Sequence, residues 1–367
     1  SGSSFNQPLD QWDTSQVTNM QAMFYLASSF NQPLDQWETS KVTDMSFMFG
    51  DASSFNQTLG QWDISQVSNM VAMFQGASSF NQPLNQWDTH KVTDMSDMFA
   101  FASSFNQPLD LWNTSQVSNM KGMFQMNSFN QTLNLWDTSQ VTDLSYMFSG
   151  AANFNQPLNF WDTSQVSDMN SMFAGASSMS SGSSFNQPLD QWDTSQVTNM
   201  QAMFYLASSF NQPLDQWETS KVTDMSFMFG DASSFNQTLG QWDISQVSNM
   251  VAMFQGASSF NQPLNQWDTH KVTDMSDMFA FASSFNQPLD LWNTSQVSNM
   301  KGMFQMNSFN QTLNLWDTSQ VTDLSYMFSG AANFNQPLNF WDTSQVSDMN
   351  SMFAGASSMS SGSSFNQ

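Results

Sequence analysis

The stretch FNQPLDQWDTSQVTNMQAMFYLASS, residues 5–29, recurs with small variations along the whole chain and decides its fold. The Phe of the FNQ motif returns after 25 residues in most units, and within each 180-residue stretch once after 24 and once after 31. Seven units make a block of 180 residues, and residues 181–367 repeat residues 1–187 without a substitution. A fixed period of this length is typical of solenoids, in which each unit packs on its neighbours. We therefore expect fourteen coils stacked in one continuous rod.

The block boundaries follow from the phase of the repeat. We predict a seven-coil block over residues 1–180, an identical block over 181–360, and the start of a third copy at 361–367. This pattern indicates a window of a longer array. Six extra residues around 177–182 form either a looped-out segment or a hinge between blocks. The apolar pattern resumes at once with Phe185 and Leu189, which favours the loop.

Apolar residues fall in fixed columns when each unit is counted from the Phe of FNQ as position 1. The columns lie at positions 1, 5, 8, 13, 16, 19, 20 and 23. One unit cannot bury these residues alone, so stacking must form a shared core. In the first unit the predicted core residues are Phe5, Leu9, Trp12, Val17, Met20, Met23 and Phe24.

The two halves of a unit predict different local structure. In the second half, apolar residues recur at helical spacing from position 13 to position 23, and Thr18 stands where an N-cap would. The first half carries Pro at position 4 in most units, which predicts a short parallel strand near positions 5–8. Leu9 and Trp12 are three residues apart, so a bulge or corner must turn both inward. The expected fold class is an α/β solenoid whose coils each contain a short parallel strand and a short helix.

The composition excludes several functions. Six Lys, no Arg and 30 acidic residues give a net charge of −24, which argues against nucleic acid and anionic membranes as partners. The chain has no Cys, and it has no apolar run long enough to insert into a bilayer. His90 and its copy His270 have no nucleophile or metal ligands beside them in the pattern. We therefore expect no enzyme activity, no catalytic residues and no bound cofactor.

The acidic column at position 9 has two interpretations. Stacked carboxylates repel one another, and calcium would neutralise them with oxygen ligands. The alternative is that each acid forms an Asx turn, which Asn113, the Asn variant in this column, also allows. Asn6 and Gln7 with their equivalents similarly predict side-chain amide ladders between coils. The candidate calcium ligands are Asp13, Asp63, Asp88, Asp137 and Asp162.

The pattern V-T-D-M-x-x-M-F-x-x-A-x-x-F-N-x-x-L-x-x-W, seen from Val42 to Trp62, resembles the BspA-like leucine-rich-repeat surface proteins. The resemblance is to the variant with units of about 25 residues and covers the whole chain. It implies a solenoid of leucine-rich-repeat-like coils, displayed outside the cell or on its surface and used for adhesion or as a scaffold. It brings no catalytic residues. The 180-residue copy departs from the family pattern and favours a long fibre.

These observations lead to two functional hypotheses. The first is a structural repeat protein that forms an extended extracellular filament or surface stalk, with itself as partner through end-to-end or lateral assembly. The alternative is a cell-surface adhesin that binds host protein or glycan through its repetitive face.

Overall fold

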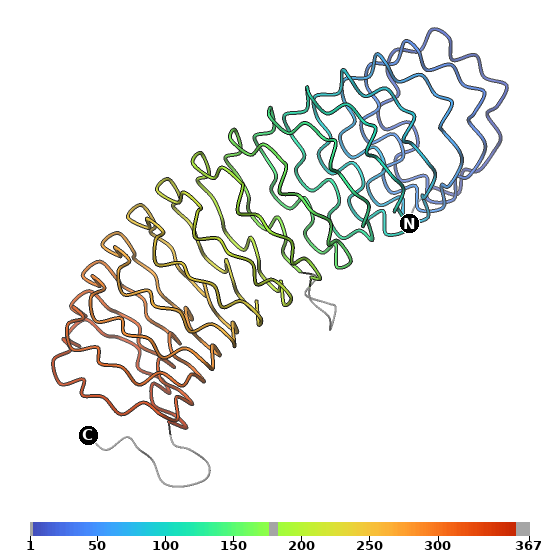
Figure 1. Ribbon diagram of the computed structural model, residues 1–367. Coiled ribbons are helices and arrows are strands. Elements are labelled where there is room, and N and C mark those ends of the chain that lie inside the picture. Colours follow the sequence, from blue (N-terminus) through green and yellow to red (C-terminus); the bar gives the residue numbers. More distant parts are fainter. Residues whose placement is uncertain (1–2, 176–182, 357–367) are drawn as a thin grey trace. The chain divides into compact units, whose positions relative to one another are not determined.

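The computed structural model describes residues 3–175 and 183–356. The chain divides into two compact units, Ser1–Pro188 and Leu189–Gln367. Within each unit every sequence repeat forms one coil, and successive coils lie side by side (Figure 1). Each unit is therefore a repeat solenoid. The predicted division at residue 180 rests on repeat phase and stays a prediction.

The secondary structure of the coil differs from the expected strand and helix. The described residues form turns and isolated parallel bridges, with no helix and no longer strand among them. The bridges join the residues at position 15 of successive coils, such as Asn19 to Asp44 and Asp44 to Asn69. Parallel pairing thus lies at position 15, and the predicted strand at positions 5–8 is wrong.

Positions 5–8 form a tight turn, in which the Trp12 N–H donates to the Leu9 carbonyl over 3.1 Å. The same turn in the second coil leaves Leu34 and Trp37 both buried, at 0% and 4% exposure. The predicted corner after the Leu is therefore confirmed. This corner lets the Leu and the Trp both point into the core, whereas residues three apart on a regular strand point to opposite faces.

The segment predicted as a helix divides its backbone hydrogen bonds between its own coil and the next. The N–H groups at positions 16, 18, 20 and 22 reach the following coil, as from Met20 to the Asp44 carbonyl over 2.9 Å, whereas the N–H at position 14 reaches the preceding coil. The N–H groups at positions 13, 19, 21 and 23 reach back three residues, as from Met23 to the Met20 carbonyl over 3.3 Å, and the N–H at position 17 donates to the side chain at position 15, as from Gln21 to Asn19 Oδ1. A helix would use all of these donors internally. Turns that place every third residue on one side produce a similar apolar spacing, which explains the wrong prediction.

Left-handed residues at positions 18 and 22 also prevent a helix. Ala22 has a φ of 54° and Leu26 a φ of 60°, and the same positions repeat this conformation in later coils. The expected N-cap residue has another role. The Thr43 hydroxyl and N–H both donate to the carbonyl of Thr18, over 3.2 Å and 2.9 Å, and so join two coils.

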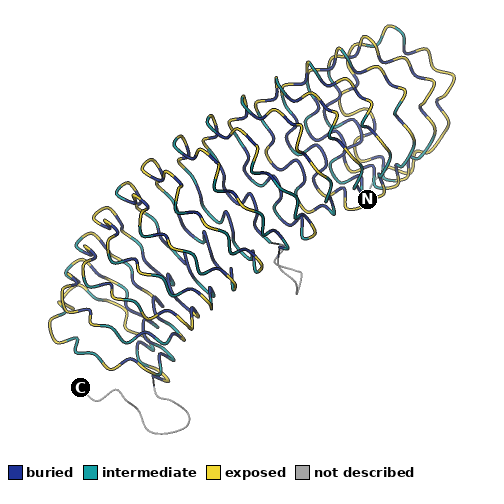
Figure 2. Cartoon of the chain, in the orientation of Figure 1, coloured by how far each residue is buried: buried dark blue, intermediate teal, exposed yellow. Residues whose placement is uncertain are grey.

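The core consists of the predicted columns, stacked in register. Buried residues recur at the same place in successive coils, and exposed residues gather mainly at the turns (Figure 2). Trp37 and Trp62 stack with ring centroids 6.5 Å apart, and Phe49 lies 4.0 Å from Phe55. Each inner Trp also donates from Nε1 to the position-5 carbonyl of the preceding coil, as Trp62 does to Leu34 over 3.0 Å. Ring stacking and this hydrogen bond fix neighbouring coils to one another.

The short coil replaces its missing residue with a buried side chain. Phe30 donates its N–H to the Ala27 carbonyl, but Phe129, after the 24-residue unit, donates instead to Oδ1 of Asn127 over 2.7 Å. Nδ2 of Asn127 donates to the carbonyls of Phe99 and Ala102, over 2.8 Å and 3.0 Å. One Asn amide therefore fills the backbone role that the deletion removes.

The columns continue after the six extra residues. Phe185 stacks on Phe173 with centroids 4.0 Å apart, and the N–H of Asn186 donates to Oδ1 of Asn155 over 3.0 Å. The predicted loop or hinge at residues 177–182 lies outside the described residues.

Candidate functional site

The first coil presents part of the predicted core to its outer face. Leu9, Met20 and Phe24 are buried, whereas Phe5, Trp12 and Met23 are 41%, 55% and 39% exposed and Val17 is half-buried. The predicted burial of these last four residues is therefore wrong for the first coil. Their equivalents in inner coils are buried, because a second neighbour covers each column there.

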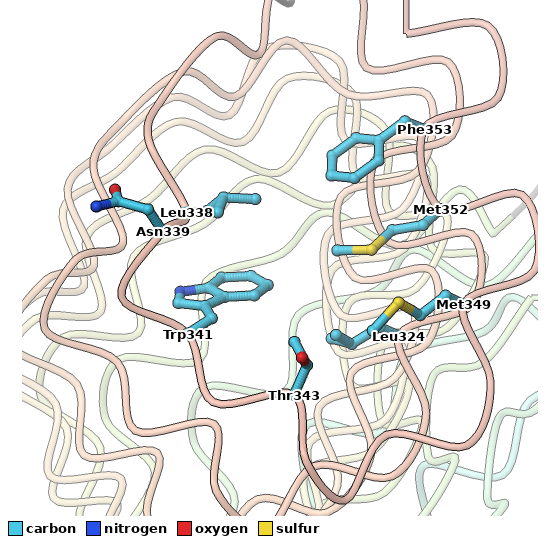
Figure 3. A pocket seen from close by; sticks show the side chains of 8 residues that line it. All are labelled: Leu324, Leu338, Asn339, Trp341, Thr343, Met349, Met352 and Phe353. Atoms are coloured by element: carbon cyan, nitrogen blue, oxygen red, sulfur yellow. The ribbon is translucent and has the colours of Figure 1, made fainter. Parts of the chain in front are cut away.

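The last described coil opens a hollow of about 420 Å³ on the same columns. In Figure 3 the Trp341 ring and the Met352 side chain face one another across it, and Phe353 lies above Met352. Asn339 points away from the hollow. The lining residues are Leu324, Leu338, Asn339, Trp341, Thr343, Met349, Met352 and Phe353. Apart from Asn339 and Thr343, they belong to the apolar columns, so among the described residues this is a core face with no further coil over it.

The acidic column at position 9 forms a series of Asx turns, which was the alternative to a calcium site. Oδ1 of Asp63 accepts the N–H of Ser65 over 3.0 Å, and Asp137 and Asp162 accept the equivalent bonds from Ser139 and Ser164. Hydrogen bonds from the hydroxyl and the N–H of Ser65 lower the pKa of Asp63. The serines beside Asp13 and Asp137 lower the pKa of those carboxyls in the same way.

The remaining candidate calcium ligand, Asp88, forms the same turn and adds a side-chain contact. Its Oδ1 accepts the N–H of His90 over 3.3 Å and lies 2.8 Å from Nδ1 of the His90 ring, on the surface. In the parts of the chain that the structure describes, no three His, Asp or Glu side chains come together as a metal site. Each candidate carboxylate therefore serves its own turn or its immediate neighbour.

The predicted amide ladder is confirmed and includes the backbone. Oδ1 of Asn31 accepts the N–H of Asn56 over 2.9 Å and Nε2 of Gln57 over 3.0 Å. The same Gln amide also donates to the Asn31 carbonyl over 3.1 Å. These half-buried side chains are occupied in joining coils, which leaves them little capacity for a ligand.

An exposed apolar row at position 7 was missed by the sequence reasoning. This position is Gln in the first four coils of the block, but it is Leu111, Leu135 and Phe160 in the next three. These side chains are 59%, 68% and 78% exposed. We call them the position-7 stripe, which the second unit repeats as Leu291, Leu315 and Phe340. The signal in the sequence was the change of residue type within a column.

Comparisons with known proteins give family and structural matches. No curated protein matches the chain. A leucine-rich repeat protein from Bacteroides ovatus aligns with 88% of this chain and 88% of its own, at 11% identity and a TM-score of 0.29. The TLR13–ssRNA13 complex aligns with 91% of this chain and 72% of its own, at 7% identity and a TM-score of 0.15.

The chain has no helix, within residues 3–175 and 183–356, of the length and apolar character that crossing a bilayer requires.

One family model matches four successive stretches that together span nearly the whole sequence. The matched stretches are residues 1–110, 99–184, 177–292 and 283–366. The chain therefore belongs to the family described as "Mycoplasma protein of unknown function, DUF285".

Proposed function

We propose that this chain is a structural repeat protein that forms an extended extracellular filament or surface stalk by stacking coils of successive copies end to end. The observation that carries the proposal is the stacking of identical columns, in which Phe and Trp rings of each inner coil pack on those of its neighbours. Among the described residues, Phe5 and Trp12 of the first coil and the hollow beside Trp341 show the same columns without a further coil over them.

The two faces match in chemistry. Each inner coil covers its neighbour by Phe-on-Phe and Trp-on-Trp stacking, at centroid distances such as 6.0 Å for Phe30–Phe55. The first coil carries Phe5 and Trp12 in the same columns, and the last carries Trp341 and Phe353. A contact that joins unlike faces repeats without closing on itself and generates a filament. The BspA-like motif supports placement of that filament on the cell surface.

The test compares two substitutions at neighbouring residues of the first coil. Trp12→Lys places a charge on the open core face, whereas Gln11→Lys places the same charge on the exposed turn. We expect light scattering to show assemblies that grow with protein concentration for the unsubstituted chain and for Gln11→Lys, and smaller ones for Trp12→Lys. Equal assembly by all three proteins, or none by any, would contradict the proposal.

The second candidate function is a surface adhesin, and the position-7 stripe favours it. Three adjacent exposed apolar side chains are a feature of interaction surfaces. A binding role through this stripe is compatible with a filament, because the stripe lies on a turn and the stacking faces lie elsewhere.

A further inference from the structure

The turn that carries the position-7 stripe does not depend on the stripe's apolar residues. With Gln11 in the turn, the Trp12 N–H donates to the Leu9 carbonyl over 3.1 Å. With Leu111 in the same turn, the Trp112 N–H donates to the Leu109 carbonyl over 3.1 Å. The turn is therefore the same with a polar or an apolar residue, and the exposed Leu and Phe side chains contribute little to the core.

Carboxylates flank the stripe. Asp110 directly precedes Leu111, and Asp137 follows Leu135 after two residues. Hydrogen bonds from Ser139 hold the pKa of Asp137 below its ordinary value, so this carboxylate is charged at neutral pH. Asp162 stands at the equivalent place beside Phe160. The surface therefore combines an apolar row with negative charges.

Charge complementarity selects the partner. A second copy of this chain, with its net charge of −24, would bring like charges together if it docked stripe to stripe. A partner with cationic side chains beside an apolar face would instead pair with the flanking carboxylates. The apolar row would exclude water from the centre of such a contact.

The length of the stripe fits a helix. Parallel bridges join successive coils, so neighbouring stripe residues lie about 4.8 Å apart along the stack. Three stripe residues then extend over roughly 10 Å, close to the ~10.5 Å that separates residues i and i+7 of a helix. We propose that the position-7 stripe binds a basic amphipathic helix of a partner protein, once in each 180-residue block.

The test uses the full chain and a synthetic 18-residue peptide with Leu on one helical face and Lys on the other. The variant returns the stripe to the Gln of the other coils and keeps every charge. We expect fluorescence anisotropy at physiological salt to show at least tenfold weaker peptide binding, with unchanged thermal stability. The substitutions are Leu111→Gln, Leu135→Gln and Phe160→Gln with Leu291→Gln, Leu315→Gln and Phe340→Gln.

A second variant adds a stripe where the chain has none. Gln at position 7 of the second, third and fourth coils becomes Leu, and the number of peptides bound per chain should rise. These substitutions are Gln36→Leu, Gln61→Leu and Gln86→Leu. A peptide with Glu in place of Lys should not bind the unsubstituted chain.

Three results would overturn the inference. One is equal peptide affinity of the unsubstituted chain and the Gln variant, and another is no binding by either. The third is self-association in sedimentation that the Gln variant loses, because it would make a second copy the occupant. End-to-end assembly uses Trp12 and the opposite core face, so its failure is separately visible in the Trp12→Lys experiment.

Discussion

At the scale of the residue, the buried Trp at position 8 joins two coils through both its ring and its N–H. Trp62 is 4% exposed, stacks on Trp37 and donates to the Leu34 carbonyl. Trp62→Ala would leave a cavity and remove one of the two hydrogen bonds that the Leu34 carbonyl accepts, at a cost of ~3–5 kcal/mol in unfolding free energy. Trp12→Ala should cost much less, because that ring is 55% exposed.

Urea unfolding followed by circular dichroism would measure both variants. The stability of a solenoid is a sum over coils and their interfaces, so Trp62→Ala should also uncouple the first coils from the rest. Equal midpoints for Trp62→Ala and the unsubstituted chain would contradict the structural role of the column.

The left-handed residues at position 22 are a second feature at the residue scale. Phe101 has a φ of 58°, whereas the equivalent residues of two other coils are Gly76 and Gly150. This conformation costs a non-Gly residue about 1–2 kcal/mol, whereas its cost for Gly is close to zero. Phe101→Gly should therefore raise the melting temperature relative to Phe101→Ala, because both remove the ring and only Gly removes the strain. A lower melting temperature for the Gly variant would argue against the strained turn.

Asp97 gives a pH-dependent prediction. Burial is the main cause that raises its pKa; Asp94 and Asp143 add to the rise, and Lys121 opposes it. A carboxyl with a raised folded pKa costs stability once the pH rises above its unfolded value of 3.8. Asp97→Asn should therefore raise the melting temperature at pH 7 and give little gain at pH 3. A gain of equal size at both pH values would contradict this assignment.

At the scale of the coil, Asn127 compensates for the deletion in the 24-residue unit. Its amide makes three buried hydrogen bonds with backbone groups, and its side chain is 5% exposed. Asn127→Ala would leave the Phe129 N–H and two carbonyls without these partners, at a cost of roughly 2–4 kcal/mol. Asn106→Ala removes an Asn from the half-exposed ladder and should cost less. Calorimetry of both variants checks this order, and the reverse order would remove the compensating role of Asn127.

The coil also shows how far the sequence alone predicts structure. Periodicity and residue type together predicted the apolar columns, the corner at Leu9 and the amide ladders. The helix and the strand did not, because turn hydrogen bonds three residues apart give nearly the same apolar spacing as a helix. The left-handed conformations at Ala22 and Phe47 leave no trace in residue type, since neither is Gly or Asn.

The candidate surfaces were less predictable than the core. The position-7 stripe is visible in the sequence only as a change within one column, from Gln86 to Leu111. Its exposure depends on the corner that turns Trp112 inward and leaves Leu111 outside.

At the scale of the whole molecule, the exact copy of the 180-residue block means that equivalent coils of the two blocks carry the same residues. The backbone and side chains that join coils are the same in each block, so a second copy offers the same contacts as a neighbouring coil. We therefore propose that copies of the chain stack end to end.

Electron microscopy of the purified chain across a range of concentrations tests this claim most directly. We expect unbranched thin fibres that lengthen with concentration. Their axial period should be about 34 Å, which is one seven-coil block at about 4.8 Å per coil. Separate particles of one fixed length, with the mass of a single chain at every concentration, would contradict it.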